Sequence, residues 1–158
     1  MGRAFRALVA VALVVAAPGA DGCSGPLRRP RLVVEDLARG RVLHTEPVTP
    51  GDAFVLAYVH SSEHVPVRGT FRVGPDRTLR VTETAFAGFG PGLPAPGPGD
   101  AWEIRDGMIT VRHAEAPLPE IVVRVVPLTR HRLRLPSGRE LDLSALMGAG
   151  GAVRLVIE

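Results

Sequence analysis

Two histidines and a glutamate stand close together directly after an apolar run. The segment reads HSSEHVP at residues 60–66 and follows the run FVLAYV. Its spacing matches the H-x-x-E-H pattern with which one class of zinc peptidases binds its metal. On a helix, His60 and His64 would share one face about 6 Å apart at Cβ, close enough to bind one zinc ion. The pattern therefore raises the question of a metal-dependent hydrolase.

The residues around this pattern favour an extended chain over a helix. Residues 54–59 are apolar and partly β-branched, and the residue before Pro66 is biased toward an extended backbone. In an extended chain the two histidines would lie about 13 Å apart, with Glu63 on the opposite side, so one tetrahedral ion could not bridge them. A turn at Ser61-Ser62 would shorten the distance but would no longer have the peptidase geometry. We expect no metal site and no catalytic residue here.

A second group of polar residues belongs to the neighbouring segments. Residues 54–60, 65–73 and 79–86 are expected to be successive strands, and Glu83 is expected on the apolar side of the last one, together with Leu79, Val81 and Ala85. A carboxylate on an apolar face needs a partner, because an unpaired buried charge is costly. The expected mutual partners are His60, Glu63, Arg68 and Glu83.

Three interpretations of this polar group remain open. It could be a structural network that fixes the strand register. It could line a polar ligand pocket beside the glycine-rich loop, whose backbone N–H groups could bind an anion. It could also bind a metal weakly through His60, Glu63 and Glu83. Neither Ser61 nor Ser62 is expected to be a nucleophile, since neighbours in a strand face opposite ways and no G-x-S-x-G segment is present.

Alternation with a period of two dominates the rest of the chain, which predicts an all-β fold. LVVED and RVLHTE flank residues 37–40 as a hairpin, and Asp106-Gly107 predicts a type I′ turn that pairs Ile104 with Ile109 and Trp102 with Val111. Residues 54–59 are expected to be a strand covered on both faces. His131 is in phase with Leu133 and Leu135, whereas residues 88–100 are expected to form a surface loop, and no segment predicts an amphipathic helix. About eleven short strands imply a single antiparallel β-sandwich or barrel-like domain.

Composition restricts the class of function. The chain has 158 residues, enough for one domain with a real core, and its hydrophobic content of 46% argues against disorder. All 19 basic residues are arginines, the net charge is +3, and aromatic residues make up only 4%. The arginines are scattered singly among apolar residues rather than clustered with stacking aromatic rings. We therefore expect no nucleic-acid binding.

The first residues have the features of an export signal. Arg3 and Arg6 precede an apolar stretch at residues 7–17, which is shorter than the roughly 20 residues that span a bilayer. Ala20-Asp21-Gly22-Cys23 is similar to the cleavage motif of bacterial lipoproteins. We expect residues 1–22 to be a signal peptide, Cys23 to be lipidated, residues 23–31 to be a tether and residues 32–158 to be the folded domain. Ordinary secretion and an uncleaved anchor are the alternatives.

The order of several motifs resembles a known family. FVLAYVHSSEHVPVRGTFRV, LRVTETAFAGFGPGLP, DGMI and EAPLPEIVVRVVPLTRHRLRL follow one another as in domain-of-unknown-function family 1850. His64 stands where that family usually has a basic residue. Arg68 and Gly69 stand where an acidic pair is common. The family's signature positions fall on His60, Ser61, Glu63, Glu83, Gly88, Gly90 and Gly92.

The resemblance implies a small exported protein that is often encoded beside TAXI-type TRAP transporters. On that basis we expect an accessory or binding protein without enzymatic activity or cofactor, held at the membrane of the cell envelope by a lipid or secreted. Its expected partners are a TRAP transporter component and a small solute. The alternatives are a hydrolase that uses His60, Glu63 and Glu83, and a purely structural envelope protein.

Overall fold

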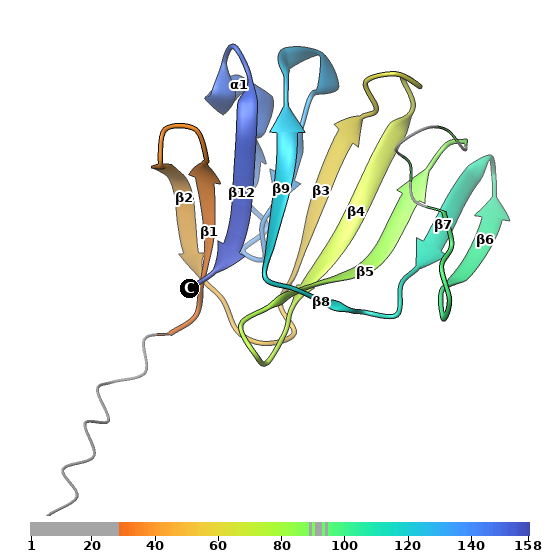
Figure 1. The fold of residues 1–158 in the computed structure, drawn as a ribbon, viewed down its shortest axis with the longest axis horizontal. Coiled ribbons are helices and arrows are strands. Elements are labelled where there is room, and N and C mark those ends of the chain that lie inside the picture. The colour runs from red at the N-terminus through yellow and green to blue at the C-terminus, as the bar shows by residue number, and fades with distance from the viewer. Residues whose placement is uncertain (1–28, 89, 91–92, 94) are drawn as a thin grey trace, which may run out of the picture.

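The chain folds into two antiparallel β-sheets that pack face to face (Figure 1). The computed structural model describes residues 29–88, 90, 93 and 95–158. The expected signal peptide, Cys23, most of the tether and Gly92 lie outside the described residues. The described elements are β1 (Arg31–Asp36), β2 (Arg41–Pro47), β3 (Ala53–Val59), β4 (Pro66–Val73), β5 (Leu79–Phe86), β6 (Ala101–Arg105), β7 (Met108–Arg112), β8 (Pro117–Leu118), β9 (Glu120–Val125), a 3₁₀ turn (Pro127–Thr129), β10 (Arg132–Arg134), β11 (Glu140–Asp142), α1 (Leu143–Met147) and β12 (Gly151–Ile157).

The two sheets differ in size and in how far apart their strands lie in the sequence. The smaller sheet has the order β2-β1-β12-β9, so its central β12 is the last strand of the chain and pairs with the first. The larger sheet has the order β11-β10-β3-β4-β5-β7-β6, and β8 pairs with the start of β5. Both sheets end in open edges, so the predicted antiparallel β-sandwich is confirmed in its sandwich form rather than as a barrel.

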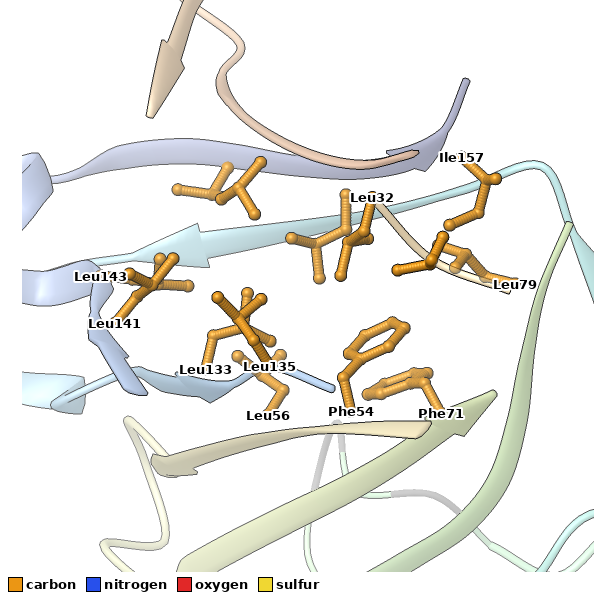
Figure 2. Packing of buried hydrophobic residues seen from close by; sticks show 14 of the residues in the cluster. Leu32, Phe54, Leu56, Phe71, Leu79, Leu133, Leu135, Leu141, Leu143 and Ile157 are labelled. Carbon is orange, nitrogen blue, oxygen red and sulfur yellow. The ribbon is translucent and has the colours of Figure 1, made fainter. Parts of the chain in front are cut away.

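The hydrophobic core lies between the sheets (Figure 2). Leu32 and Ile157 of the smaller sheet face Phe54 and Leu133 of the larger one, and all four are buried. The rings of Phe54 and Phe71 stack with centroids 5.2 Å apart. Burying one such side chain stabilises the fold by about 1.5–3 kcal/mol. The alternation of apolar residues read from the sequence therefore marks the face of each strand that points into this layer.

The larger sheet extends beyond the smaller one toward β7 and β6 (Figure 1). We call the face that points to the smaller sheet the inner face and the opposite one the outer face. Past the sandwich, a second apolar cluster lies on the inner face, formed by Val67, Phe86, Ile109 and Val111 with Leu93 of the glycine-rich loop packed against it. The expectation that residues 54–59 are covered on both faces is wrong, because Val55 and Ala57 line surface hollows of the outer face.

The structure confirms the predicted turn between β6 and β7 and contains one helix that the sequence pattern does not predict. Asp106-Gly107 joins β6 to β7 with Ile104 opposite Ile109 and Trp102 opposite Val111, as predicted. The short helix α1 was not expected. Its N-terminus is capped by Asp142, whose carboxylate accepts a hydrogen bond from the Ala145 N–H at 2.9 Å. No helix in the described part of the chain is long and apolar enough to cross a membrane.

Candidate functional site

The HSSEH segment forms a tight turn between β3 and β4. The His64 N–H donates to the His60 carbonyl at 3.0 Å, and the His60 N–H donates to the Val65 carbonyl at 2.9 Å. His64 has a φ of 55°, the left-handed conformation that closes such turns. The expected extended chain is therefore wrong for residues 61–64, because β3 and β4 are adjacent antiparallel strands that the segment must connect. The helix required by the peptidase motif does not form either.

Inside this turn, three side chains form an exposed hydrogen-bonded group. The Ser62 hydroxyl lies 3.2 Å from His60 Nδ1 and donates to Glu63 Oε1 at 3.3 Å. The Glu63 N–H donates to His60 Nδ1 at 3.4 Å, which leaves the ring proton on Nε2. In the described part of the chain, no group of three or more His, Cys, Asp or Glu is placed to hold a metal ion. The group orders the turn.

The glycine-rich loop lies against this turn. A Cβ atom on Gly90 would approach Cγ and Cδ of Glu63 to 2.6 Å, so the glycine permits the close contact between loop and glutamate. Gly88 has a φ of 113°, a conformation that residues with a side chain rarely adopt. Ser61 is exposed and lines a small neighbouring cavity together with His60. Glu63 and Gly90, two of the residues singled out in the sequence, thus lie in contact.

A β-bulge in β5 places Glu83 on the outer face of the larger sheet. Thr70 pairs with Glu83 and Phe71 pairs with Val81, so Thr82 is an extra residue on its strand. The Thr82 hydroxyl donates to the Thr70 carbonyl at 3.1 Å. Because of the bulge, Leu79 and Val81 face the core whereas Glu83 and Ala85 face outward. The expectation that all four share one face is therefore wrong.

The predicted network of four polar residues is divided into two pairs. Glu83 Oε1 lies 3.7 Å from Nη2 of Arg68, and both side chains are on the outer face. His60 and Glu63 interact through the turn described above. Among the described residues, no hydrogen bond or ion pair connects the two pairs. The expected single network of four residues is therefore not formed: one pair lies in the turn and the other on the outer face of the larger sheet.

A cavity of about 580 Å³ opens on the outer face over β3, β4, β5 and β7. We call it the outer-face cavity. Its apolar surface includes Val59, Ala85 and Met108, and its charged groups belong to three residues, Arg68, Glu83 and Arg130. The Arg130 side chain has no ion-pair partner among the described residues. Arg130 follows the 3₁₀ turn with a φ of 48°, a conformation that could not be anticipated from the sequence pattern.

A buried histidine lies behind the turn. His131 is 4% exposed, its ring stacks on Tyr58 with centroids 4.8 Å apart, and its Nδ1 lies 2.7 Å from the Thr129 hydroxyl. That hydroxyl donates to the Val126 carbonyl, so it accepts the proton of His131 Nδ1. Burial lowers the pKa of His131 from 6.5 to about 4. The imidazole is therefore neutral at physiological pH, and its expected phase with Leu133 and Leu135 is confirmed, since all three are buried.

A relay of three polar side chains was missed by the sequence reasoning. Nε2 of His113 lies 2.9 Å from the Thr84 hydroxyl, and Nδ1 lies 3.2 Å from Oδ2 of Asp100. The N–H of Gly97, then that of Ala114, and the His113 imidazole hold the pKa of the Asp100 carboxyl below its ordinary value. All three relay residues line a cavity of about 440 Å³. The arrangement matches the nucleophile, base and orienting acid of hydrolases, but it also fastens the loop before β6 onto the sheet.

The pairing of β5 with β7 is the only signal that could have revealed this relay. Thr84 is opposite Val111, so the residue two positions later, His113, lies on the same face as the threonine. That register depends on the bulge at Thr82. Asp100 comes from the glycine-rich and proline-rich tract, where no periodicity predicts a contact.

Comparison with known proteins identifies a family. A family model described as Domain of unknown function (DUF1850) matches residues 54–143. The matched range contains nearly all of the larger sheet and the contact between Glu63 and Gly90. It also contains the residues of the outer-face cavity and of the relay. Of the smaller sheet it contains β9 only. No curated protein and no solved structure matches the chain.

Proposed function

The chain belongs to the domain of unknown function family DUF1850, and from that membership and the outer-face cavity we propose that it is an exported, non-catalytic binding protein serving a solute uptake system. The N-terminal apolar stretch supports export, and Cys23 supports a lipid anchor at the membrane of the cell envelope. The resemblance noted in the sequence supports a TRAP transporter of TAXI type as the uptake system.

The outer-face cavity is the observation that carries the binding role. Its volume of about 580 Å³ is within the range of small-molecule sites, and it combines an apolar floor with a few charged groups, as such sites do. Of its described lining residues, none is a Ser, Cys or His. This composition suits reversible binding and offers no pair of nucleophile and imidazole base.

The charges of the cavity favour a small organic anion with an apolar portion. The guanidinium group of Arg130 has no ion-pair partner among the described residues, so it can bind a carboxylate without first breaking another contact. Arg68 is held by Glu83 at 3.7 Å, a distance at which the pair is weak. The aliphatic part of the ligand would then lie against Val59 and Met108.

Calorimetry on the purified full chain with short aliphatic carboxylates tests ligand binding. We expect Arg130→Gln to weaken binding by about tenfold or more, because a charge-assisted hydrogen bond is lost. Arg72→Gln is the matched control, since Arg72 is an exposed arginine on β4 that does not line the cavity. Equal affinities of the two variants, or no binding by the parent chain, would contradict the proposal.

Crosslinking and purification from bacterial membranes test the partner. We expect a transporter component to be captured with the parent chain and lost with Glu83→Ala or His60→Ala while each variant remains folded. Unchanged capture would place the contact elsewhere, and capture of no transporter component would contradict the proposed partner.

Cys23→Ser is expected to move the protein from the membrane fraction to the soluble fraction.

A second candidate function is hydrolysis of an ester or amide, and the relay of Thr84, His113 and Asp100 favours it. Thr84 is on a strand paired on both sides, so its backbone N–H is engaged in the sheet and cannot stabilise an oxyanion. For that reason binding is the leading proposal. Hydrolysis of p-nitrophenyl esters that is lost in Thr84→Val and kept in Thr84→Ser would reverse this order.

A further inference from the structure

The larger sheet ends in a strand with an open edge. Among the described strands, β6 pairs with β7 alone (Figure 1). In a hairpin closed by a two-residue turn, the residues flanking the turn form a hydrogen-bonded pair, and the pattern then alternates along the strand. Arg105, Glu103 and Ala101 therefore direct their main-chain groups to β7. The N–H and C=O groups of Trp102 and Ile104 point outward from the edge.

The same two residues expose large apolar side chains. Trp102 is 53% exposed and Ile104 is 59% exposed. They lie opposite Val111 and Ile109 and so extend the second apolar cluster of the inner face to the rim of the sheet. Proteins protect such edges with prolines, charged side chains or bulges. Strand β6 has no proline and no bulge, and its two charged residues have opposite signs. At the other end of the sheet, β11 has only three residues, and two of them are acidic.

The charges of β6 show which partner fits the edge. Half-buried Glu103 and exposed Arg105 lie on the outer face, two residues apart. Glu103 accepts a hydrogen bond from Arg112 at 2.8 Å, whereas Arg105 has no ion-pair partner among the described residues. If a second β6 pairs antiparallel with Ile104 opposite Ile104, each Glu103 lies opposite the Arg105 of the other copy. Opposite charges on directly facing residues stabilise a sheet, so the strand is complementary to itself.

We propose that β6 is a dimerisation strand that pairs with β6 of a second copy of this chain and joins two larger sheets into one. The contact is two-fold symmetric, so both copies use the same surface. The central Ile104 residues exchange two main-chain hydrogen bonds, and each Trp102 covers the isoleucine of the other copy diagonally. Two ion pairs between Glu103 and Arg105 form on the outer face of the contact between the two copies.

Charge reversal tests the pairing in the full chain. In mild detergent, sedimentation equilibrium is expected to show a dimer, and Glu103→Arg or Arg105→Glu alone should raise its dissociation constant about tenfold or more, because like charges then face each other at two places. The double variant Glu103→Arg with Arg105→Glu restores opposite charges and should recover the dimer. Arg112→Gln is the control for the lost Arg112 contact and should leave the dimer intact.

Cysteine crosslinking locates the contact independently. Ile104→Cys treated with a short bismaleimide should give a crosslinked dimer, while Val42→Cys, 56% exposed on β2, should not exceed the parent chain, which reports the background from Cys23. A monomer at all concentrations overturns the proposal. A dimer that ignores both charge reversals, or that crosslinks equally through Val42→Cys, also overturns it, because its contact would then lie away from β6.

Discussion

The buried His131 should make the fold less stable in mildly acidic solution, because its imidazole gains a proton there only when the chain unfolds. The imidazole is 4% exposed between Tyr58 and Thr129, and burial lowers its pKa from 6.5 to about 4. The unfolded chain therefore binds a proton at a pH where the folded chain does not. Stability from the neutral buried ring is present above pH 6.5 and is lost as the pH falls from 6.5 toward 4.

The size of the effect follows from those two pKa values. Linkage between protonation and folding gives a loss of about 2 kcal/mol between pH 7 and pH 5. Urea denaturation of the parent chain and of His131→Gln at both pH values measures it. The variant will be less stable at pH 7, but its change in stability between the two pH values should be smaller by about 2 kcal/mol.

An exposed histidine supplies the control. His64 is at the surface of the turn between β3 and β4, so His64→Gln should leave the pH dependence of the parent chain unchanged. If His131→Gln retains the full pH dependence, the buried imidazole does not titrate as described and the reasoning fails. The proton signal of the His131 ring in an NMR titration gives the folded-state pKa directly.

Three further predictions concern stability. Thr84→Val removes the hydroxyl that is hydrogen-bonded to Nε2 of His113. It should lower the free energy of unfolding by about 1 kcal/mol and speed amide exchange in residues 97–100, measured by denaturation and hydrogen exchange. Gly150→Ala should lower the free energy of unfolding by about 2 kcal/mol or more, because its φ is 97° and a Cβ would lie 2.7 Å from a backbone carbonyl. Gly40→Ala should lower it by about 1 kcal/mol, because its φ is 58° but no atom lies within 4 Å of the added Cβ. Equal losses of melting temperature in the two variants would contradict this. Phe54→Ala should cost about 3–5 kcal/mol in urea denaturation, and a loss below 1 kcal/mol would mean that the ring is not part of the core.

Period-two alternation and turn chemistry were sufficient to predict the fold. The type I′ turn at Asp106-Gly107 defines which residues face each other in its hairpin, and Ile104 is opposite Ile109 as expected. Such signals are local, because the turn and its flanking strands are contiguous in the sequence. The short helix α1 is not predicted from the sequence, because five residues are too few for a helical period to be recognised.

The candidate site was less predictable because it depends on two interruptions of the alternation. The bulge at Thr82 turns Glu83 outward, and no residue type in TETAF marks the extra position. The turn at residues 61–64 brings the main-chain N–H of Glu63 to the His60 ring, although valines and a proline nearby favour an extended chain. Arg130 and the relay of Thr84, His113 and Asp100 depend on contacts between distant segments, which one sequence does not reveal.

The central position of β12 governs the order in which this molecule can form. Residues 151–157 are synthesised after every other described strand, yet they lie between β1 and β9 and contribute Val153, Leu155 and Ile157 to the core. Until they arrive, β1 and β9 have no shared neighbour and the larger sheet has no complete cover. Folding can therefore be completed only after residues 151–157 have been synthesised. A nascent polypeptide that stops before residue 151 would leave its leucines and phenylalanines accessible to chaperones and proteases.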